Sequence, residues 1–356
     1  MNAPSKKDRL TLAVDAMGGD AAPAMVIEGL DLAMEKLPNV RFQVFGDEAQ
    51  VQPLIDRYPR VQTATTLTHT ADRIPNEMKP SAALRQGRKS SMALAINAVK
   101  AGEADGIVSA GNTGALMALA MFGLRMLPGI SRPGIASFFP TMRGETVMLD
   151  LGANVDCDAE NLVQFAVMGE VFARQVLGHE KPSVGILNVG AEDQKGNSAV
   201  KAAFEILSRS ELPIDFYGFV EGDDIGRGTV DVVVTDGFTG NIALKTAEGT
   251  ARLFGHLLKE ALMGSTGGRL GALLARPALK EFKKRVDPRR YNGAMFLGLN
   301  GICVKSHGGT DAVGFAHAVE VAVELILDRL NDEIHADYSR LLDSGALAGL
   351  KEAASG

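Results

Sequence analysis

Short β-branched runs alternate with amphipathic stretches of about 10–20 residues along most of this chain, and this alternation constrains the fold more than any other feature. It is typical of βα units, in which each strand is followed by a helix that crosses back over the sheet. The sequence therefore predicts an α/β fold with a doubly wound, mainly parallel sheet. Residues 1–356 are expected to form one domain, either undivided or with two lobes.

The same pattern predicts the individual elements. Apolar runs predict strands at residues 10–14, 40–45, 61–67, 105–109, 184–187, 214–217, 230–235 and 302–304, with an antiparallel pair at 135–139 and 146–151. Helical periodicity predicts helices at residues 25–37, 48–57, 90–100, 112–125, 158–177 and 199–208, and one that begins near residue 311. Residues 68–89 show no steady period and are expected to form a long functional loop.

The composition is that of an ordinary globular protein, with 46% apolar residues, a net charge of −6 and a pI near 5.6. A net charge of this sign does not suit a nucleic-acid partner. Cys157 and Cys303 are expected to be structural, because no CxxC pair or histidine cluster indicates a disulfide or a metal site. No signal-peptide or membrane-spanning pattern is found, so we expect a cytoplasmic protein without cofactor or metal.

Three of the expected strand-to-helix junctions consist almost entirely of glycine and polar residues: residues 109–114 (SAGNTG), 188–197 (NVGAEDQKGN) and 235–241 (TDGFTGN). Each brings backbone amides and a helix N-terminus to the carboxyl end of a strand, an arrangement that binds phosphate. Ordinary helix caps with permissive glycines also fit these residues. The candidate donors are Ser109, Gly111, Asn112, Thr113, Gly114, Gly237 and Gly240.

A further glycine-rich turn, residues 15–20 (DAMGGD), follows the first expected strand. It lacks the spacing of a dinucleotide-binding fingerprint, which disfavours a dehydrogenase. Asp15, Gly18 and Gly19 are well placed at a strand exit to contribute to a substrate site, and a plain turn capped by Asp15 also fits them.

Four side chains in the polar segments are candidates for catalysis. Lys195 stands among glycines and acids, where phosphate or an oxyanion is a suitable partner, and a solvated surface lysine is the alternative. Asp236 and Asn241 bracket the third junction and either could instead cap the helix. His307 lies in the segment KSHGGTD, directly after an expected strand. No nucleophile elbow or paired cysteine indicates covalent catalysis.

Residues 242–287 are predicted to form a protruding amphipathic helical hairpin with a flexible turn at residues 264–268 (GSTGG). Residues 252–290 hold ten Lys or Arg and three Asp or Glu, whereas the whole chain is negative. Apolar stripes flanked by basic residues suit an anionic membrane surface, an acidic carrier protein or a dimer partner. The expected contact residues are Arg252, Leu253, Leu257, Leu258, Lys259, Arg269, Lys280 and Lys283.

Five ordered segments carry a resemblance to a known family: residues 13–23 (AVDAMGGDAAP), 109–117 (SAGNTGALM), 149–156 (LDLGANVD), 187–197 (LNVGAEDQKGN) and 233–241 (VVTDGFTGN). Together they resemble the bacterial phosphate acyltransferases of phospholipid synthesis, over about residues 10–330. The resemblance implies reversible transfer of a long-chain fatty acyl group from acyl carrier protein to inorganic phosphate. The acyl phosphate would then serve a membrane-embedded glycerol-phosphate acyltransferase.

The resemblance also implies a homodimer that associates peripherally with the membrane. It implies a fold akin to the phosphotransacetylases and the isocitrate and isopropylmalate dehydrogenases. The family's site residues carry over best to Lys195, Asp236, Asn241 and His307. Because phosphate is a competent nucleophile and a thioester is already activated, we expect direct attack without a covalent enzyme intermediate.

Within that mechanism, Lys195 and the amides of residues 111–114 are expected to hold phosphate and oxyanion charge. Asn241 is expected to polarise the carbonyl, and Asp236 to orient Lys195 or to move a proton. Two other functions stay open at this point. One is a short-chain phosphotransacetylase that uses coenzyme A, and the other is a regulatory protein that binds phosphate or lipid without turnover.

Overall fold

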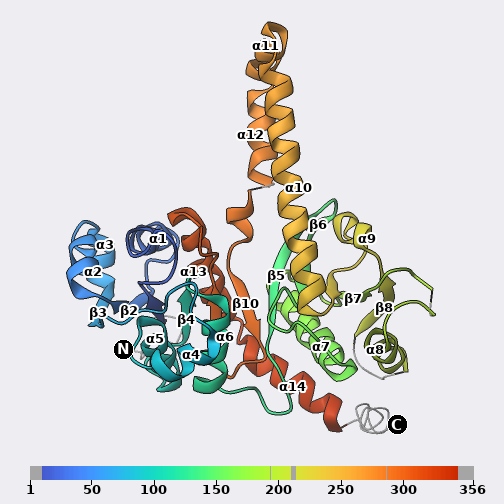
Figure 1. Cartoon of the computed structure of the whole chain (residues 1–356), viewed down its shortest axis with the longest axis horizontal. Coiled ribbons are helices and arrows are strands. Elements are labelled where there is room, and N and C mark those ends of the chain that lie inside the picture. Colours follow the sequence, from blue (N-terminus) through green and yellow to red (C-terminus); the bar gives the residue numbers. More distant parts are fainter. Residues whose placement is uncertain (1–9, 193, 210–213, 286, 344–356) are drawn as a thin grey trace, which may run out of the picture.

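The computed structural model describes residues 10–192, 194–209, 214–285 and 287–343. Its centre is an eleven-stranded mixed sheet in the order β3-β2-β1-β4-β11-β10-β5-β6-β9-β7-β8 (Figure 1). The strands are β1 (Thr11–Asp15), β2 (Arg41–Gly46), β3 (Thr65–His69), β4 (Gly106–Ser109), β5 (Gly134–Thr141), β6 (Gly144–Leu149), β7 (Ser183–Leu187), β8 (Asp215–Val220), β9 (Val232–Val234), β10 (Ala294–Leu297) and β11 (Ile302–Lys305). The predicted α/β fold with a mainly parallel sheet is confirmed.

Three antiparallel pairings interrupt the otherwise parallel sheet: β11 with β10, β10 with β5, and β5 with β6. Within the sheet, the parallel strands β3, β2, β1, β4 and β11 are therefore antiparallel to the parallel strands β6, β9, β7 and β8. Six steps separate β1 from β9, and a twist of about 20–25° per step rotates these strands by roughly 120–150° relative to each other.

Helices cover both faces of the sheet, and successive strand residues alternate between two cores. In β4, Val108 packs into one core and Ile107 into the other. The first core is covered by α1 (Ala24–Met34), α2 (Glu48–Ile55), α3 (Pro59–Ala64), α7 (Ala159–Val176), α8 (Ser198–Arg209), α13 (Ala312–Leu327) and α14 (Leu330–Asp343). The second is covered by α4 (Pro80–Gln86), α5 (Ser91–Lys100), α6 (Thr113–Gly123) and α9 (Gly222–Arg227). Burial on both faces explains why the strands are apolar runs.

Some predicted elements are wrong. Residues 61–64, predicted as part of a strand, belong to α3, because Pro59 suits the first helical turn and Val61 and Ala64 are buried at helical spacing. The predicted loop at residues 68–89 contains α4. The sequence reasoning did not predict α9, β10 or the short 3-10 helix Pro288–Tyr291.

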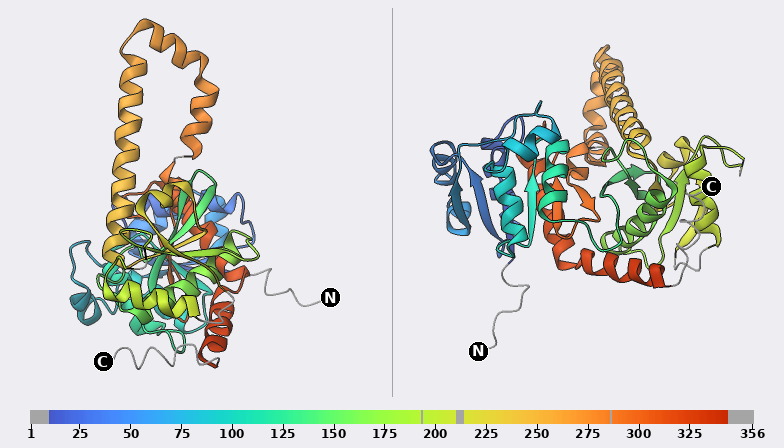
Figure 2. Two further views of the ribbon diagram at one scale, coloured as in Figure 1. Left: turned by 90° about the vertical axis from the view of Figure 1, so that its right-hand side faces the viewer. Right: turned by 60° about the horizontal axis from the view of Figure 1, so that its bottom comes forward.

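The predicted hairpin projects from the body of the molecule (Figures 1 and 2). It consists of α10 (Gly237–Met263), α11 (Thr266–Leu274) and α12 (Arg276–Arg285). The two helices predicted for it were residues 242–263 and 270–286, so the second is divided in the structure. Residue 286 lies outside the described residues. Ser265 caps α11 by accepting the Gly268 amide at 2.9 Å. The Arg269 guanidinium donates to the Met263 carbonyl oxygen at 3.0 Å, which closes the turn.

Candidate functional site

The carboxylate of Asp15 is buried where β1 ends. It accepts hydrogen bonds from the hydroxyls of Ser91 at 2.6 Å and Ser109 at 2.7 Å, and from the Met17 amide at 3.3 Å. Burial raises the pKa of this carboxyl, and the two hydroxyl donors oppose the rise. A Cβ on Gly18 would lie 2.6 Å from the Asp15 carboxylate, so the turn needs glycine there. Asp15 is thus the centre that joins the ends of β1 and β4.

Lys305 is a buried lysine beside Asp15 that the sequence reasoning did not select. It ends β11, and its ammonium group donates to the carbonyl oxygens of Ser306 and of Ala110, the latter at 3.5 Å. Burial lowers the pKa of Lys305 to about 8, and the negative charges of Asp15 and Asp20 limit the decrease. The sequence did hold a signal for Lys305: a lysine directly after the expected apolar strand 302–304, where the segment KSHGGTD begins.

His307 lies just beyond Lys305, in a loop that Asn292 holds. The Asn292 side chain accepts the His307 amide at 2.7 Å and donates to the Ser306 hydroxyl at 2.8 Å. The Gly309 amide donates to His307 Nδ1 at 3.1 Å, so the proton of the neutral ring is on Nε2. Partial burial and the charge of Lys245 lower the pKa of His307, which favours the neutral ring at neutral pH.

The first polar junction, residues 109–114, is largely paired within the protein. The Ser109 hydroxyl donates to Asp15 and accepts the Gly111 amide at 3.1 Å. Asn112 caps α6 by accepting the Ala115 amide at 2.9 Å. The amides of Thr113 and Gly114, in the first turn of α6, are therefore the donors of this junction best suited to an anion. Gly19 has a φ of +110° and shapes the neighbouring turn.

In the second junction, Lys195 is half-exposed and forms an ion pair with Glu192 at 2.8 Å. This hydrogen bond raises the pKa of Lys195 and lowers that of Glu192. The carboxamide of Asn188 donates to the Lys195 carbonyl oxygen at 3.1 Å, which holds the loop against the end of β7. Residue 193 lies outside the described residues. The ammonium group of Lys195 is thus paired with Glu192, an exposed carboxylate that a ligand can displace, and not with Asp236.

In the third junction, Asp236 is the N-cap of α10. Its two carboxylate oxygens accept the amide and the hydroxyl of Thr239, each at 2.8 Å. The Gly237 amide donates to the Asn154 carbonyl oxygen at 2.7 Å, and the Gly240 amide donates to the Asp236 carbonyl oxygen at 2.9 Å. These two glycine amides are therefore engaged, although they were expected to bind phosphate. A Cβ on Gly240 would overlap the Asp150 carbonyl oxygen, so both glycines act through close packing.

Asn241 anchors the loop that follows β6. Its carboxamide donates to the Leu151 carbonyl oxygen at 3.1 Å. The same loop is organised by Asp150, which is fully buried and accepts hydrogen bonds from Ile135 N, Gly152 N, Ala153 N, Asn154 N and Asn154 Nδ2 at 2.7–3.1 Å. Burial raises the pKa of Asp150, and these donors oppose the rise. Asn241 was expected to polarise the substrate carbonyl, but in the structure it holds the loop after β6 in place. A second N–H of its carboxamide is available.

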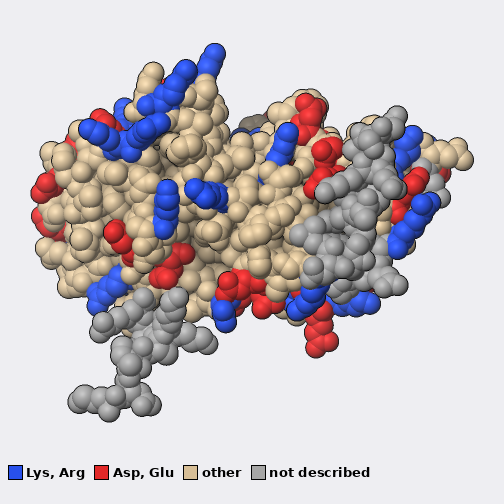
Figure 3. All heavy atoms as spheres, turned by 90° about the horizontal axis from the view of Figure 1, so that it is seen from below, with Lys and Arg blue, Asp and Glu red and all other residues tan. Residues whose placement is uncertain are grey.

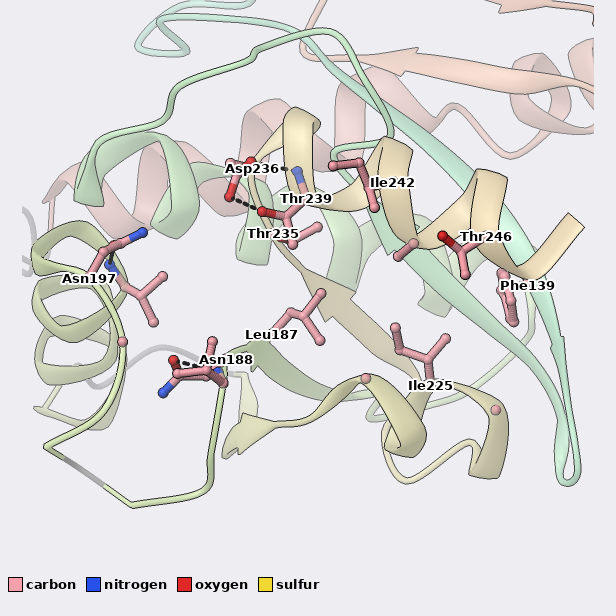
Figure 4. A pocket seen from close by; sticks show the side chains of 16 residues that line it. Phe139, Leu187, Asn188, Asn197, Ile225, Thr235, Asp236, Thr239, Ile242 and Thr246 are labelled. Carbon is pink, nitrogen blue, oxygen red and sulfur yellow. Dashed lines mark hydrogen bonds between the residues drawn. The ribbon is translucent and has the colours of Figure 1, made fainter. Parts of the chain in front are cut away.

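A cavity of about 840 Å³ lies beside the first turns of α10, and we call it the α10 pocket (Figure 4). Its size is within the range of small-molecule sites. Residues of the second and third junctions line it together with β5, α8 and α9: Phe139, Leu187, Asn188, Val189, Gly196, Asn197, Val200, Gly222, Ile225, Gly226, Thr235, Asp236, Thr239, Ile242, Ala243 and Thr246.

Helix α10 divides the expected site residues into two groups. At about 100° per residue, Thr239, Ile242 and Thr246 share the face that lines the α10 pocket. Lys245 and Asn241 lie on another face, and the charge of Lys245 acts on Lys305 and His307. The second and third junctions therefore meet at the pocket, whereas the first junction adjoins the segment of His307, where the Ser306 amide donates to the Ser109 carbonyl oxygen at 2.9 Å.

The residues expected to contact a membrane or a carrier protein lie on the projecting hairpin. Leu253, Leu257 and Leu258 are 55%, 48% and 42% exposed, and Arg252 pairs with Glu248 at 3.2 Å. The remaining expected contacts are also exposed: Lys259, Arg269, Lys280 and Lys283. None of the helices in the described ranges is long and apolar enough to cross a bilayer.

Comparison with known proteins identifies close relatives. The family model described as "Fatty acid synthesis protein" matches residues 10–332. A phosphate acyltransferase from Paramagnetospirillum magneticum is 64% identical over 332 residues, which cover 93% of this chain and 95% of that protein.

Two solved structures share the fold at low sequence identity. A phosphotransacetylase from Streptococcus pyogenes aligns with a TM-score of 0.62 at 16% identity, over 91% of this chain and 95% of that chain. A branched-chain phosphotransacylase from Enterococcus faecalis aligns with a TM-score of 0.56 at 13% identity, over 89% of this chain and 99% of that chain. The expected relation to the phosphotransacetylase fold is confirmed.

The depressed pKa of Lys305 predicts a pH-dependent stability. The folded pKa of about 8 lies below the ordinary 10.5, so the folded state binds fewer protons than the unfolded state between these pH values. Relative to Lys305→Met, the wild-type free energy of unfolding should rise by up to about 1.4 kcal/mol per pH unit from about pH 8 to 10.5. Urea unfolding of both proteins across this range measures the difference. Lys181→Met, at an exposed lysine whose charge does not act on Lys305, is the control, and a wild-type difference independent of pH would contradict the assignment.

Proposed function

This chain belongs to the fatty acid synthesis protein family, and we propose that it transfers a long-chain fatty acyl group from acyl carrier protein to inorganic phosphate. The product is an acyl phosphate for phospholipid synthesis, and the transfer is reversible. The observation that supports this most directly is the α10 pocket, where two glycine-rich polar junctions adjoin an apolar cavity. An acyl thioester and phosphate need a polar and an apolar region side by side.

The chemistry needs no covalent enzyme intermediate. An oxygen of hydrogen phosphate attacks the thioester carbonyl carbon, the C–O bond forms and the C–S bond breaks. The proton of the hydrogen phosphate passes to the departing sulfur, which gives acyl phosphate and the carrier thiol. The protein contributes position and charge stabilisation, because nucleophile and thioester are already reactive.

We assign the charge-stabilising roles to Lys195 and His307. Lys195 exchanges Glu192 for a phosphate oxygen, which its half-exposed ion pair allows. The neutral His307 ring offers an Nε2 donor, and the Thr113 and Gly114 amides offer further donors. Asp236 keeps acceptor capacity beyond its bonds to Thr239 and remains our candidate for moving a proton.

Three residues expected at the substrate take positioning roles in this proposal. Asn241 holds the loop at residues 150–154, and Ser109 holds Asp15. Asp15 in turn joins β1, α5 and β4 through its serine donors. Each is a group whose hydrogen bonds are internal, so substitution would act on substrate through the geometry of the junctions.

The exposed hairpin is our candidate for contact with the membrane surface that would receive the product. Its apolar and basic residues project away from the body of the molecule (Figure 2). The face from which the hairpin points away carries both Lys or Arg and Asp or Glu (Figure 3). Acyl phosphate hydrolyses readily, so delivery beside a membrane-embedded glycerol-phosphate acyltransferase would protect it. A homodimer and docking of acyl carrier protein belong to the same proposal.

The proposed activity predicts phosphate-dependent formation of acyl phosphate from palmitoyl acyl carrier protein. Hydroxylamine traps acyl phosphate as a hydroxamate, which is measured with and without phosphate. We expect C16 carrier thioester to be used at least tenfold faster than acetyl-coenzyme A, because short chains lose the apolar contacts. Turnover with acetyl-coenzyme A alone would instead identify a short-chain phosphotransacetylase, and binding without turnover would identify a regulatory protein.

Replacement of Lys195 tests the phosphate assignment. We expect Lys195→Ala to lower kcat/KM for phosphate about 10–100-fold, because a charge-assisted hydrogen bond contributes about 1.5–3 kcal/mol. Lys181→Ala removes an exposed lysine outside the pocket lining and is the matched control. Unchanged turnover in Lys195→Ala would show that this ammonium group does not hold phosphate.

The membrane assignment is tested with the double variant Leu257→Glu, Leu258→Glu. Binding to vesicles of anionic phospholipid should fall at least tenfold, because two apolar side chains are replaced by like-charged carboxylates. Flotation with labelled vesicles measures the bound fraction. Gly249→Glu with His256→Glu adds the same charges to the opposite, exposed face of the same helix. Equal flotation of the Leu257/Leu258 variant and the wild type would exclude this surface.

A further inference from the structure

The α10 pocket has a polar side and an apolar side. Figure 4 places Asn188, Asn197 and Asp236 on one side and Phe139 and Ile225 on the other. Leu187 and Ile242 lie between them, and Thr246 is the labelled polar residue near the apolar side. The polar side belongs to the junctions that carry Lys195 and Asp236. The apolar side is built by β5, α9 and the second turn of α10.

We propose that the apolar side of the α10 pocket binds the hydrocarbon chain of the acyl group, and that Gly226 and Ala243 set how much of the chain it accepts. The inference rests on the proposed acyl transfer and adds to it a location and a length limit for the chain. The thioester carbonyl then lies at the polar side, next to the loop of Lys195 and the start of α10.

The lining favours an alkyl chain over the amide-bearing pantetheine arm of a thioester donor. Ile225, on the apolar side, is only 6% exposed, so the inner wall there includes buried hydrocarbon surface. Amide groups placed against such a wall would lose their hydrogen bonds to water without replacement. An alkyl chain has no such requirement and gains about fourfold in affinity for each buried methylene.

The entrance is apolar as well. Val189 and Ile242 line the pocket while 77% and 50% exposed. Large apolar side chains left open to solvent at the edge of a cavity are typical of a surface that a ligand covers. A chain entering between them would continue onto the buried wall of Ile225 and Phe139. The exposed and buried lining residues thus form one continuous apolar path.

Gly226 and Gly222 leave open space in α9 along this path. A Cβ built on either residue meets no atom within 4 Å, and neither has a positive φ. Both glycines line the pocket. A larger side chain at Gly226 therefore has room at the pocket lining without displacing protein atoms close to its Cβ, and the helix accommodates it. The position allows the pocket to be shortened with little risk to the fold.

The test is the chain-length profile of Gly226→Leu, with Ala243→Phe as a second variant should the first fail to fold. Rates are measured with acyl carrier protein carrying C8, C12 and C16 chains. Loss of room for two methylenes predicts a fall of about 15-fold in the ratio of kcat/KM for C16 to that for C8. Gly249→Leu makes the same substitution at an open position of α10 outside the pocket lining and should keep the wild-type ratio.

Each outcome has one meaning. An unchanged C16 to C8 ratio in active pocket variants overturns the inference. An equal loss at every chain length also overturns it, because the pocket would then hold the pantetheine arm. A wild-type protein inactive with all three thioesters would refute the proposed function instead.

A binding measurement separates the inference from turnover. Decylphosphonate and butylphosphonate are stable alkyl analogues that can be titrated calorimetrically into wild type and variants. Wild type should bind the decyl compound at least tenfold more tightly than the butyl compound, and Gly226→Leu should reduce this preference to below threefold. A preference retained in the variant would place the alkyl chain elsewhere.

Discussion

Two buried carboxylates, Asp15 and Asp150, organise the loops on which the candidate site depends. A charge or polar group removed from water must be matched by hydrogen bonds, so each aspartate draws its donors from several segments. Asp15 takes them from α5, β4 and its own turn, and Asp150 takes them from β5 and the loop at residues 150–154. The junctions cannot move independently while these groups remain satisfied.

Helix α10 connects the chemistry to the outside of the molecule. It begins at the Asp236 cap beside the α10 pocket and continues for 27 residues, roughly 40 Å, to the turn of the hairpin. On one face its first turns line the pocket with Ile242 and two threonines, and on another face Lys245 acts through its charge on Lys305 and His307. Contact at the exposed part of the helix would therefore act on a rigid element that also forms a wall of the site.

Sequence periodicity was sufficient for most elements but failed where two signals overlapped. Residues 61–64 have β-branched character, yet they form a helical turn after Pro59 because their burial follows helical spacing. The strand β10 was missed because its four residues are bounded by glycines and pair antiparallel with β5 and β11. Local pattern cannot anticipate such pairing, which depends on partners far along the chain.

The candidate site, like the fold, could be predicted from the sequence only in part. The glycine-rich junctions and their positions after strands follow from local composition, and so did the resemblance that the relatives confirm. The sequence alone did not reveal that Ser109 and Asn241 donate hydrogen bonds to groups within the protein, or that Lys305 is buried where the charge of Asp15 acts on it.

Periodicity and motif spacing are local properties, so they were enough to predict the α/β class, the family and the polar segments. Which donors stay free and which face of α10 meets the pocket became clear only in the three-dimensional structure. Those outcomes depend on burial, which arises when distant segments pack together.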